Sequence, residues 1–70
     1  MASSVNRLRT MIAELRNAGL DNDEIARRAH IHRSDIYRFS QGDSRALANS
    51  FGRIAMLFEQ VTGKSMPPEQ

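Results

Sequence analysis

The stretch DNDEIARRAHIHRSDIYRFSQG, residues Asp21 to Gly42, decides how the rest of the chain is interpreted. Asp21 is a favourable N-cap residue and Glu24 follows three positions later, which is the pattern of a capping box. Leu20 before the cap can pack on Ile25 as a hydrophobic staple. Gly42 closes the stretch with a residue suited to a left-handed helix stop. We therefore expect two short helices joined by a tight turn, a helix-turn-helix over residues 21–42.

Apolar residues within this stretch place the turn and the inward faces of both helices. The first helix runs to about Ala29, residues 30–32 form the turn, and the second helix runs from about Arg33 to Gln41. The residues expected to face inward are Ile25, Ala26, Ala29, Ile31, Ile36 and Phe39. The outward side of the second helix then carries Arg33, Ser34, Tyr37, Arg38 and Gln41.

Two longer amphipathic segments flank the central stretch. In residues 5–18 apolar side chains recur at spacings of three and four, and Gly19 provides a helix stop. The apolar residues of 47–61 also share one helical face, and Gly63 ends that helix. Gly52 inside the last pattern costs about 1 kcal/mol relative to alanine. This cost leaves open a break in the helix near that position.

The composition predicts one small helical domain. We expect a flexible lead over residues 1–4, the domain over residues 5–63 and a tail over residues 64–70. A chain of seventy residues buries only about 60% of its unfolded surface, so self-association is the expected source of extra stability. There is no cysteine and there are two histidines, so we expect no disulfide, no metal site and no cofactor.

Positive charge is concentrated around the central stretch. The net charge is +2, and nine of the ten basic residues are arginine. Residues 27–45 contain five arginines against two aspartates, whereas the charges of residues 46–70 balance. A basic patch of this kind favours a polyanionic partner. A solvated arginine-rich surface without a partner explains the charge alone equally well.

The sequence contains no membrane or export signal. No apolar run approaches the roughly 18–20 residues of a transmembrane helix. The N-terminal residues lack the apolar segment of a signal peptide. We therefore expect a cytoplasmic protein that does not contact membranes.

The apolar frame of the central stretch resembles the helix-turn-helix of lambda-repressor-like and Cro-like (XRE-type) regulators. The matching residues are Ile25, Ala26, Ala29, Ile31, Ile36 and Phe39, and the segment SDIYRFSQG, residues 34–42, is similar to the end of a recognition helix. The resemblance covers about residues 8–63. It implies a compact all-α domain of four to five helices that binds a palindromic operator on double-stranded DNA as a homodimer. Such proteins repress or switch transcription.

Three positions depart from the family pattern. His30 stands where the family usually has a glycine, at a turn position that tends to need a positive φ. His32 stands where the family usually caps the recognition helix with serine, and Asp35 near the helix start can compensate. Asn22 occupies the place of a phosphate-contacting glutamine and has the same donor chemistry.

The expected contacts with DNA divide into base reading and phosphate binding. Arginine pairs with guanine and glutamine with adenine in the major groove. The candidate base-reading residues are Arg33, Ser34, Tyr37, Arg38 and Gln41, with Arg33 and Ser34 deepest in the groove. Tyr37 could instead bond a phosphate, and Arg38 and Gln41 suit either role. The candidate phosphate contacts are Asn22, His32, Ser44 and Arg45.

The last helix contains a candidate dimer interface. Met56 is apolar but falls opposite the apolar face of its helix, and Leu57 flanks that face. Both residues are therefore assigned to the homodimer interface. A two-fold dimer would place two recognition helices about 34 Å apart, one turn of DNA.

An alternative function is a helical protein-interaction module, such as an antitoxin or anti-activator. It would not show the steep salt dependence that a DNA-binding protein shows. Catalysis is not expected, because the sequence has no paired acid–base constellation and no glycine-rich phosphate loop. No small-molecule ligand is evident.

Overall fold

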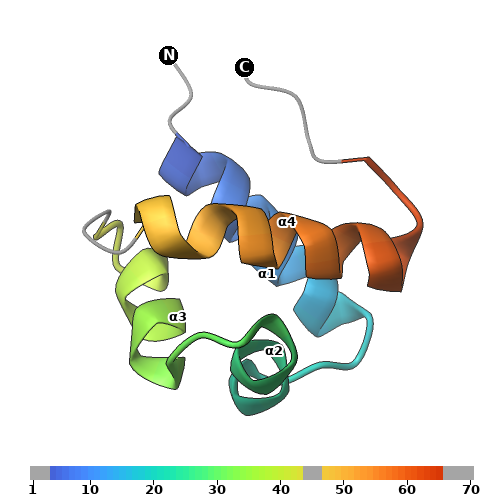
Figure 1. The fold of residues 1–70 in the computed structure, drawn as a ribbon, viewed down its shortest axis with the longest axis horizontal. Helices are drawn as coiled ribbons and strands as arrows, with labels where there is room; N and C mark the ends of the chain where they lie inside the picture. Colours follow the sequence, from blue (N-terminus) through green and yellow to red (C-terminus); the bar gives the residue numbers. More distant parts are fainter. Residues whose placement is uncertain (1–3, 44–46, 66–70) are drawn as a thin grey trace.

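The computed structural model describes residues 4–43 and 47–65, with side chains for residues 5–43 and 50–65. These residues form four α-helices and no strand (Figure 1). The helices are α1 (Ser4–Asn17), α2 (Asn22–Ala29), α3 (Arg33–Ser40) and α4 (Leu47–Thr62). The all-α expectation is thus confirmed for the described part of the chain. Of the four to five helices expected, four are present there.

The two long helices support the two short ones. α1 and α4 share the most extensive helix–helix packing, and α4 crosses in front of α1 in Figure 1. α2 packs against both α3 and α4, and in Figure 1 it lies nearly end-on below α4, with α3 beside it. This arrangement leaves the outer sides of α2 and α3 free of other helices among the described residues.

One apolar core lies between the four helices. Five of the six residues of the central stretch that were expected inside belong to this core. The sixth, Ile31, is partly buried and packs against it. The central core residues are Ile25, Ala26, Ala29, Ile36 and Phe39; α1 contributes Leu8, Met11, Ile12 and Leu15, and α4 contributes Ile54, Leu57 and Phe58. Leu57, which was assigned with Met56 to a dimer interface, is only 5% exposed and belongs to this core. Its position one residue beyond Met56 turns it toward α1 and α2.

Helix α2 begins with half of the predicted capping box. Asp21 has extended backbone geometry, and its Oδ1 accepts a hydrogen bond of 2.8 Å from the Glu24 N–H. The Glu24 carboxylate does not reach back to the cap; it accepts hydrogen bonds from Arg27 and from Arg28. These bonds, that from Arg27 first, hold the pKa of Glu24 below its ordinary value.

Three helices end in the same left-handed motif. One or two positions after the end of α1, α2 and α3, a residue with a positive φ reverses the backbone. The N–H group of the following residue then donates to the carbonyl oxygen five positions before it, as in a Schellman motif. The positive-φ residues are Gly19 (103°), His30 (60°) and Gly42 (84°). The expectation that position 30 needs a positive φ is confirmed. A histidine here adopts a conformation that glycine adopts at both other sites.

Two helix boundaries differ from those expected. α1 already includes Ser4, which was expected in the N-terminal lead. α4 runs without interruption through Gly52, so the break left open there is absent. Ile54 and Phe58, one turn apart in the core, hold this helix on α1 and offset the low helix propensity of glycine.

Within the described ranges, no helix is both long enough and apolar enough to cross a bilayer. The same ranges contain no cluster of three or more histidine, cysteine, aspartate or glutamate side chains placed to hold a metal ion. Most of the expected lead and tail, residues 1–3 and 66–70, lies outside the described part.

Candidate nucleic-acid interface

Helix α3 divides cleanly into a buried and an exposed side. Ile36 and Phe39 are three residues apart and both enter the core. All five candidate base-reading side chains are consequently exposed: Arg33, Ser34, Tyr37, Arg38 and Gln41. Tyr37 is 62% exposed, which is unusual for a large aromatic side chain. The exposed side of α3 is therefore rich in hydrogen-bond donors around one aromatic ring.

The packing of α2 against α3 creates a surface hollow of about 550 Å³ at this side. We call it the recognition hollow; its lining residues are Asn22, His32, Arg33, Ser34 and Tyr37. It combines two of the candidate phosphate contacts with three of the candidate base-reading residues. Arg38 and Gln41 are exposed but do not line it.

Two arginines of α3 are held by carboxylates. Arg33 Nη1 lies 3.0 Å from Asp23 Oδ1 on α2, and Arg38 Nη1 lies 3.2 Å from Asp35 Oδ1 one turn earlier. The side chains of Arg33 and Asp23 are 71% and 66% exposed, and ion pairs at such positions contribute only about 0–1 kcal/mol. A guanine edge or a phosphate can replace the carboxylate at little cost. The two pairs meanwhile orient the guanidinium groups.

The N-terminus of α3 lacks a side-chain cap. His32 occupies the N-cap position with extended backbone (φ −79°, ψ 142°), but its imidazole makes no capping hydrogen bond. Asp35, which was expected to compensate, sits in the first turn, where its carboxylate pairs with Arg38. Free N–H groups at a helix start attract anions. Because His32, Arg33 and Ser34 line the recognition hollow, these donors border it.

Asn22 connects the recognition hollow with a second hollow of about 140 Å³ between α1 and α3. Its Oδ1 atom is buried and has no hydrogen-bond partner within the described residues. An unpaired buried acceptor costs about 1–3 kcal/mol, and native proteins keep few of them. A water molecule or a donor group of a ligand is the natural partner for this atom.

The second hollow contains two arginines that were not among the candidate residues. Arg9 and Arg16 of α1 line it together with Ser40 of α3. Both arginines are exposed, and neither has an ion-pair partner among the described residues. Their spacing of seven residues, two helical turns, places them on one side of α1 and is the signal that could have identified them. They extend the basic surface from α3 onto α1.

The remaining candidate residues are distributed elsewhere. Ser44 and Arg45, expected to contact phosphates, lie outside the described residues. On α4, Met56 is 64% exposed and Leu57 is buried. Neither residue lines the recognition hollow.

Comparison with known proteins does not add to this picture. No protein-family model, no curated protein and no solved structure matches the chain. The function of the site is therefore inferred from its residues and geometry.

Proposed function

We propose that this chain is a sequence-specific DNA-binding transcriptional regulator of the lambda-repressor-like kind, with α3 as its recognition helix in the major groove. The observation that carries the proposal is the recognition hollow, where α2 and α3 present amide, hydroxyl, imidazole, guanidinium and phenol groups together. These are the groups that contact bases and phosphates in DNA complexes.

Base reading is assigned to the exposed side of α3. Arg33 and Ser34, at the helix start, would reach deepest toward the base edges, as in other helix-turn-helix proteins. Arg33 can donate two hydrogen bonds to guanine O6 and N7 once Asp23 releases it. Tyr37 would contact a thymine methyl or a phosphate. Arg38 and Gln41 lie further along the same side and would bind at its edge.

Phosphate binding is assigned to the residues around that side. Asn22, His32 and the uncapped start of α3 provide hydrogen-bond donors beside the recognition hollow. Arg9 and Arg16 add two positive charges on α1, next to Asn22. Contacts of this type fix the orientation of a protein on DNA without reading its sequence.

Two copies of the chain would bind the two halves of a palindromic operator. The small size of the core favours an assembly larger than one chain. The protein would act as a repressor or switch by occupying a promoter.

The proposal is tested by titrating duplex DNA from directly upstream of its own gene with the protein, over a series of salt concentrations. Affinity should fall linearly on a logarithmic plot with a slope near −0.9 per phosphate contact. Arg33→Ala should cost about 1–3 kcal/mol of specific binding. Arg38→Ala should have a similar effect, whereas Arg45→Ala should weaken all sequences alike.

Arg27→Ala is the matched control for Arg33→Ala. Each arginine side chain is 71% exposed and pairs with one carboxylate, but Arg27 does not line the recognition hollow. Its loss should leave discrimination between operator and random DNA unchanged. If Arg33→Ala also left discrimination unchanged, α3 would not be the reading helix.

A further inference from the structure

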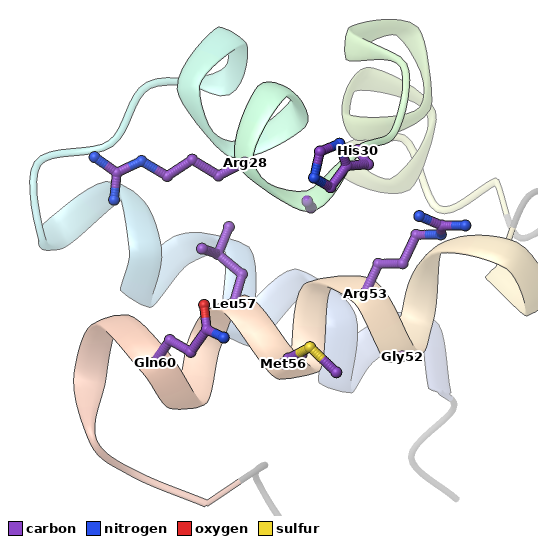
Figure 2. Close-up of a pocket in the computed structure, with 8 residues that line it drawn as sticks. Arg28, His30, Gly52, Arg53, Met56, Leu57 and Gln60 are labelled. Atoms are coloured by element: carbon purple, nitrogen blue, oxygen red, sulfur yellow. The ribbon is translucent and has the colours of Figure 1, made fainter.

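A second basic surface lies between α2 and α4, on residues that the proposed DNA contacts do not use. It is a hollow of about 680 Å³, which we call the α2–α4 groove (Figure 2). Its lining includes Arg28 and His30 from the end of α2, and Arg53, Met56, Leu57 and Gln60 from α4. The groove and the recognition hollow have no lining residue in common.

The rim of the groove is positively charged. Arg28 and Arg53 come from its two sides, and Figure 2 shows their side chains at opposite ends. Arg53 has no ion-pair partner among the described residues, and Arg28 is held only through its Nε, 2.6 Å from Glu24. No carboxylate lines the groove. Its charge is therefore available to an anionic group.

The floor of the groove is apolar. Met56 is 64% exposed, and with Tyr37 it is one of two large apolar side chains exposed in the described part of the chain. Leu57 closes the groove from below, and in Figure 2 it points up between α4 and α2. Gly52 also lines the groove, and no heavy atom outside its chain neighbours and the surrounding helix backbone lies within 4 Å of the position that a Cβ atom would occupy there. An apolar group can enter here and contact Met56, whose flexible thioether adapts to different shapes.

Arginine and methionine are the residues enriched in the centres of protein interfaces, whereas lysine, aspartate and glutamate are depleted. The groove follows this composition: it contains two arginines and a methionine, and neither lysine nor carboxylate. A DNA backbone would use the arginines but leave the apolar floor uncovered. The combination of charged rim and apolar floor thus fits a protein segment better than a nucleic acid.

We propose that the α2–α4 groove binds an acidic amphipathic helix of another protein. Apolar side chains of that helix would cover Met56 and Leu57, and its carboxylates would pair with Arg28 and Arg53. This interaction does not depend on DNA binding, and both surfaces can be occupied at once.

A second copy of this chain is a poorer occupant. The charged residues of α4 are Arg53 and Glu59, so a second copy of α4 would bring no net negative charge to the groove. Like charges in contact at an interface oppose association. An acidic helix supplies the opposite charge instead.

The test is selection of a displayed random-peptide library on the full chain, followed by affinity measurement of the recovered peptides. Recovered sequences should be acidic, with apolar residues at helical spacing. Their affinity should fall about tenfold or more in Arg53→Glu and several-fold in Met56→Ala. Arg16→Glu makes the same charge change at an exposed arginine of α1 and should have less than about a threefold effect. All three sites are exposed, and thermal melting checks that each variant folds.

Three outcomes would overturn the proposal. One is a selection that yields no binders, or only neutral or basic peptides. Another is equal loss of affinity in Arg16→Glu and Arg53→Glu, which would indicate unspecific attraction to a basic protein. The third is loss of duplex binding or of self-association in Arg53→Glu with peptide binding unchanged, which would assign the groove to DNA or to a second copy. DNA binding is measured in parallel on Arg33→Ala, so the two proposals fail separately.

Discussion

The recognition hollow and the α2–α4 groove are built from similar residues but differ in what surrounds them. Each contains a histidine, at least one arginine and one large exposed apolar side chain: Tyr37 in the hollow (62% exposed) and Met56 in the groove (64% exposed). In the hollow these groups stand beside an amide and a hydroxyl at a helix start. In the groove they stand beside Leu57 and Ala29.

The difference shows that arginine content alone does not identify a partner. Polar donors that are spread over an exposed helix suit the edges of bases and the phosphates beside them. An apolar floor below two arginines suits a partner that has its own apolar side chains. Helix α2 contributes residues to both surfaces. Substitutions in α2, and in residues that pack against it, therefore test whether the recognition hollow and the α2–α4 groove act separately.

The largest expected effect is that of Phe39→Ala. Phe39 is fully buried in the shared core, and its truncation should lower the free energy of unfolding by about 3–5 kcal/mol. For a domain of this size that loss removes most of the stability and both binding activities. Urea denaturation followed by circular dichroism measures it. A loss below about 1 kcal/mol would contradict the placement of α3 in a shared core.

A substitution at the turn between the two surfaces should come next. His30 has φ 60°, a region that β-branched residues avoid, so His30→Val should destabilise by about 1–2 kcal/mol. His30→Gly should be neutral or stabilising by a few tenths of a kcal/mol, since glycine adopts this conformation without strain. Thermal unfolding of the two variants gives the comparison. Equal stability of both would mean that residue 30 is not left-handed in solution.

Truncation of the two exposed apolar residues should separate the surfaces. Tyr37→Ala should weaken operator binding about tenfold and leave the recovered acidic peptides bound. Met56→Ala should weaken binding of those peptides several-fold and leave operator binding unchanged. Because both side chains are more than half exposed, neither change should alter the free energy of unfolding by more than about 0.5 kcal/mol. If either variant weakened both activities equally, the two surfaces would have to be regarded as one.

Removal of the N-cap of α2, the helix that contributes to both surfaces, should destabilise its N-terminal end. Asp21→Ala deletes the acceptor for the Glu24 N–H and should cost about 1 kcal/mol in urea denaturation. Asp23→Ala removes a carboxylate from the same turn without removing the cap, and should cost less. Hydrogen exchange should show faster opening around Asn22 than around Arg28. Uniform opening along α2 would contradict a local role for the cap.

The smallest effect is expected from the Glu24 carboxylate. Its pKa is lowered in the folded chain by the hydrogen bonds from Arg27 and then Arg28, from an ordinary value of 4.5. A lowered folded-state pKa stabilises the fold at pH values above the ordinary one, and this contribution is lost as the pH falls through the folded-state pKa. Wild type should therefore be slightly more stable than Glu24→Gln at neutral pH. The two should converge in acid, which urea titrations at both pH values would measure; a constant difference would exclude this linkage.

Much of the fold was predictable from local sequence signals. The N-cap at Asp21 and the stops at Gly19 and Gly42 each depend on a few adjacent residues, and the structure contains all of them. The inward residues of α2 and α3 follow from helical periodicity, and so does the exposure of Tyr37. The boundary at Ser4 and the continuity of α4 through Gly52 were less predictable, because packing against other helices overrides weak local preferences.

The site was predictable only in part. The candidates Asn22, His32 and Arg33 line one hollow, since α2 and α3 are adjacent in sequence and joined by a short turn. The second Glu24 contact of the capping box did not form, because arginines one turn later compete for the same carboxylate. Leu57, assigned with Met56 to a dimer interface, is buried because α4 packs on α1 and α2.

Short-range patterns in the chain were sufficient to place the helices, their caps and their buried sides, because these depend on interactions between residues at most a few positions apart. The two hollows, the Arg33–Asp23 pair and the placement of Arg28 and Arg53 along one groove depend on how separate helices pack. No local pattern encodes that packing, since it results from the burial of all four helices in one core. The same packing turned Leu57 inward and left Met56, its immediate neighbour, at the surface.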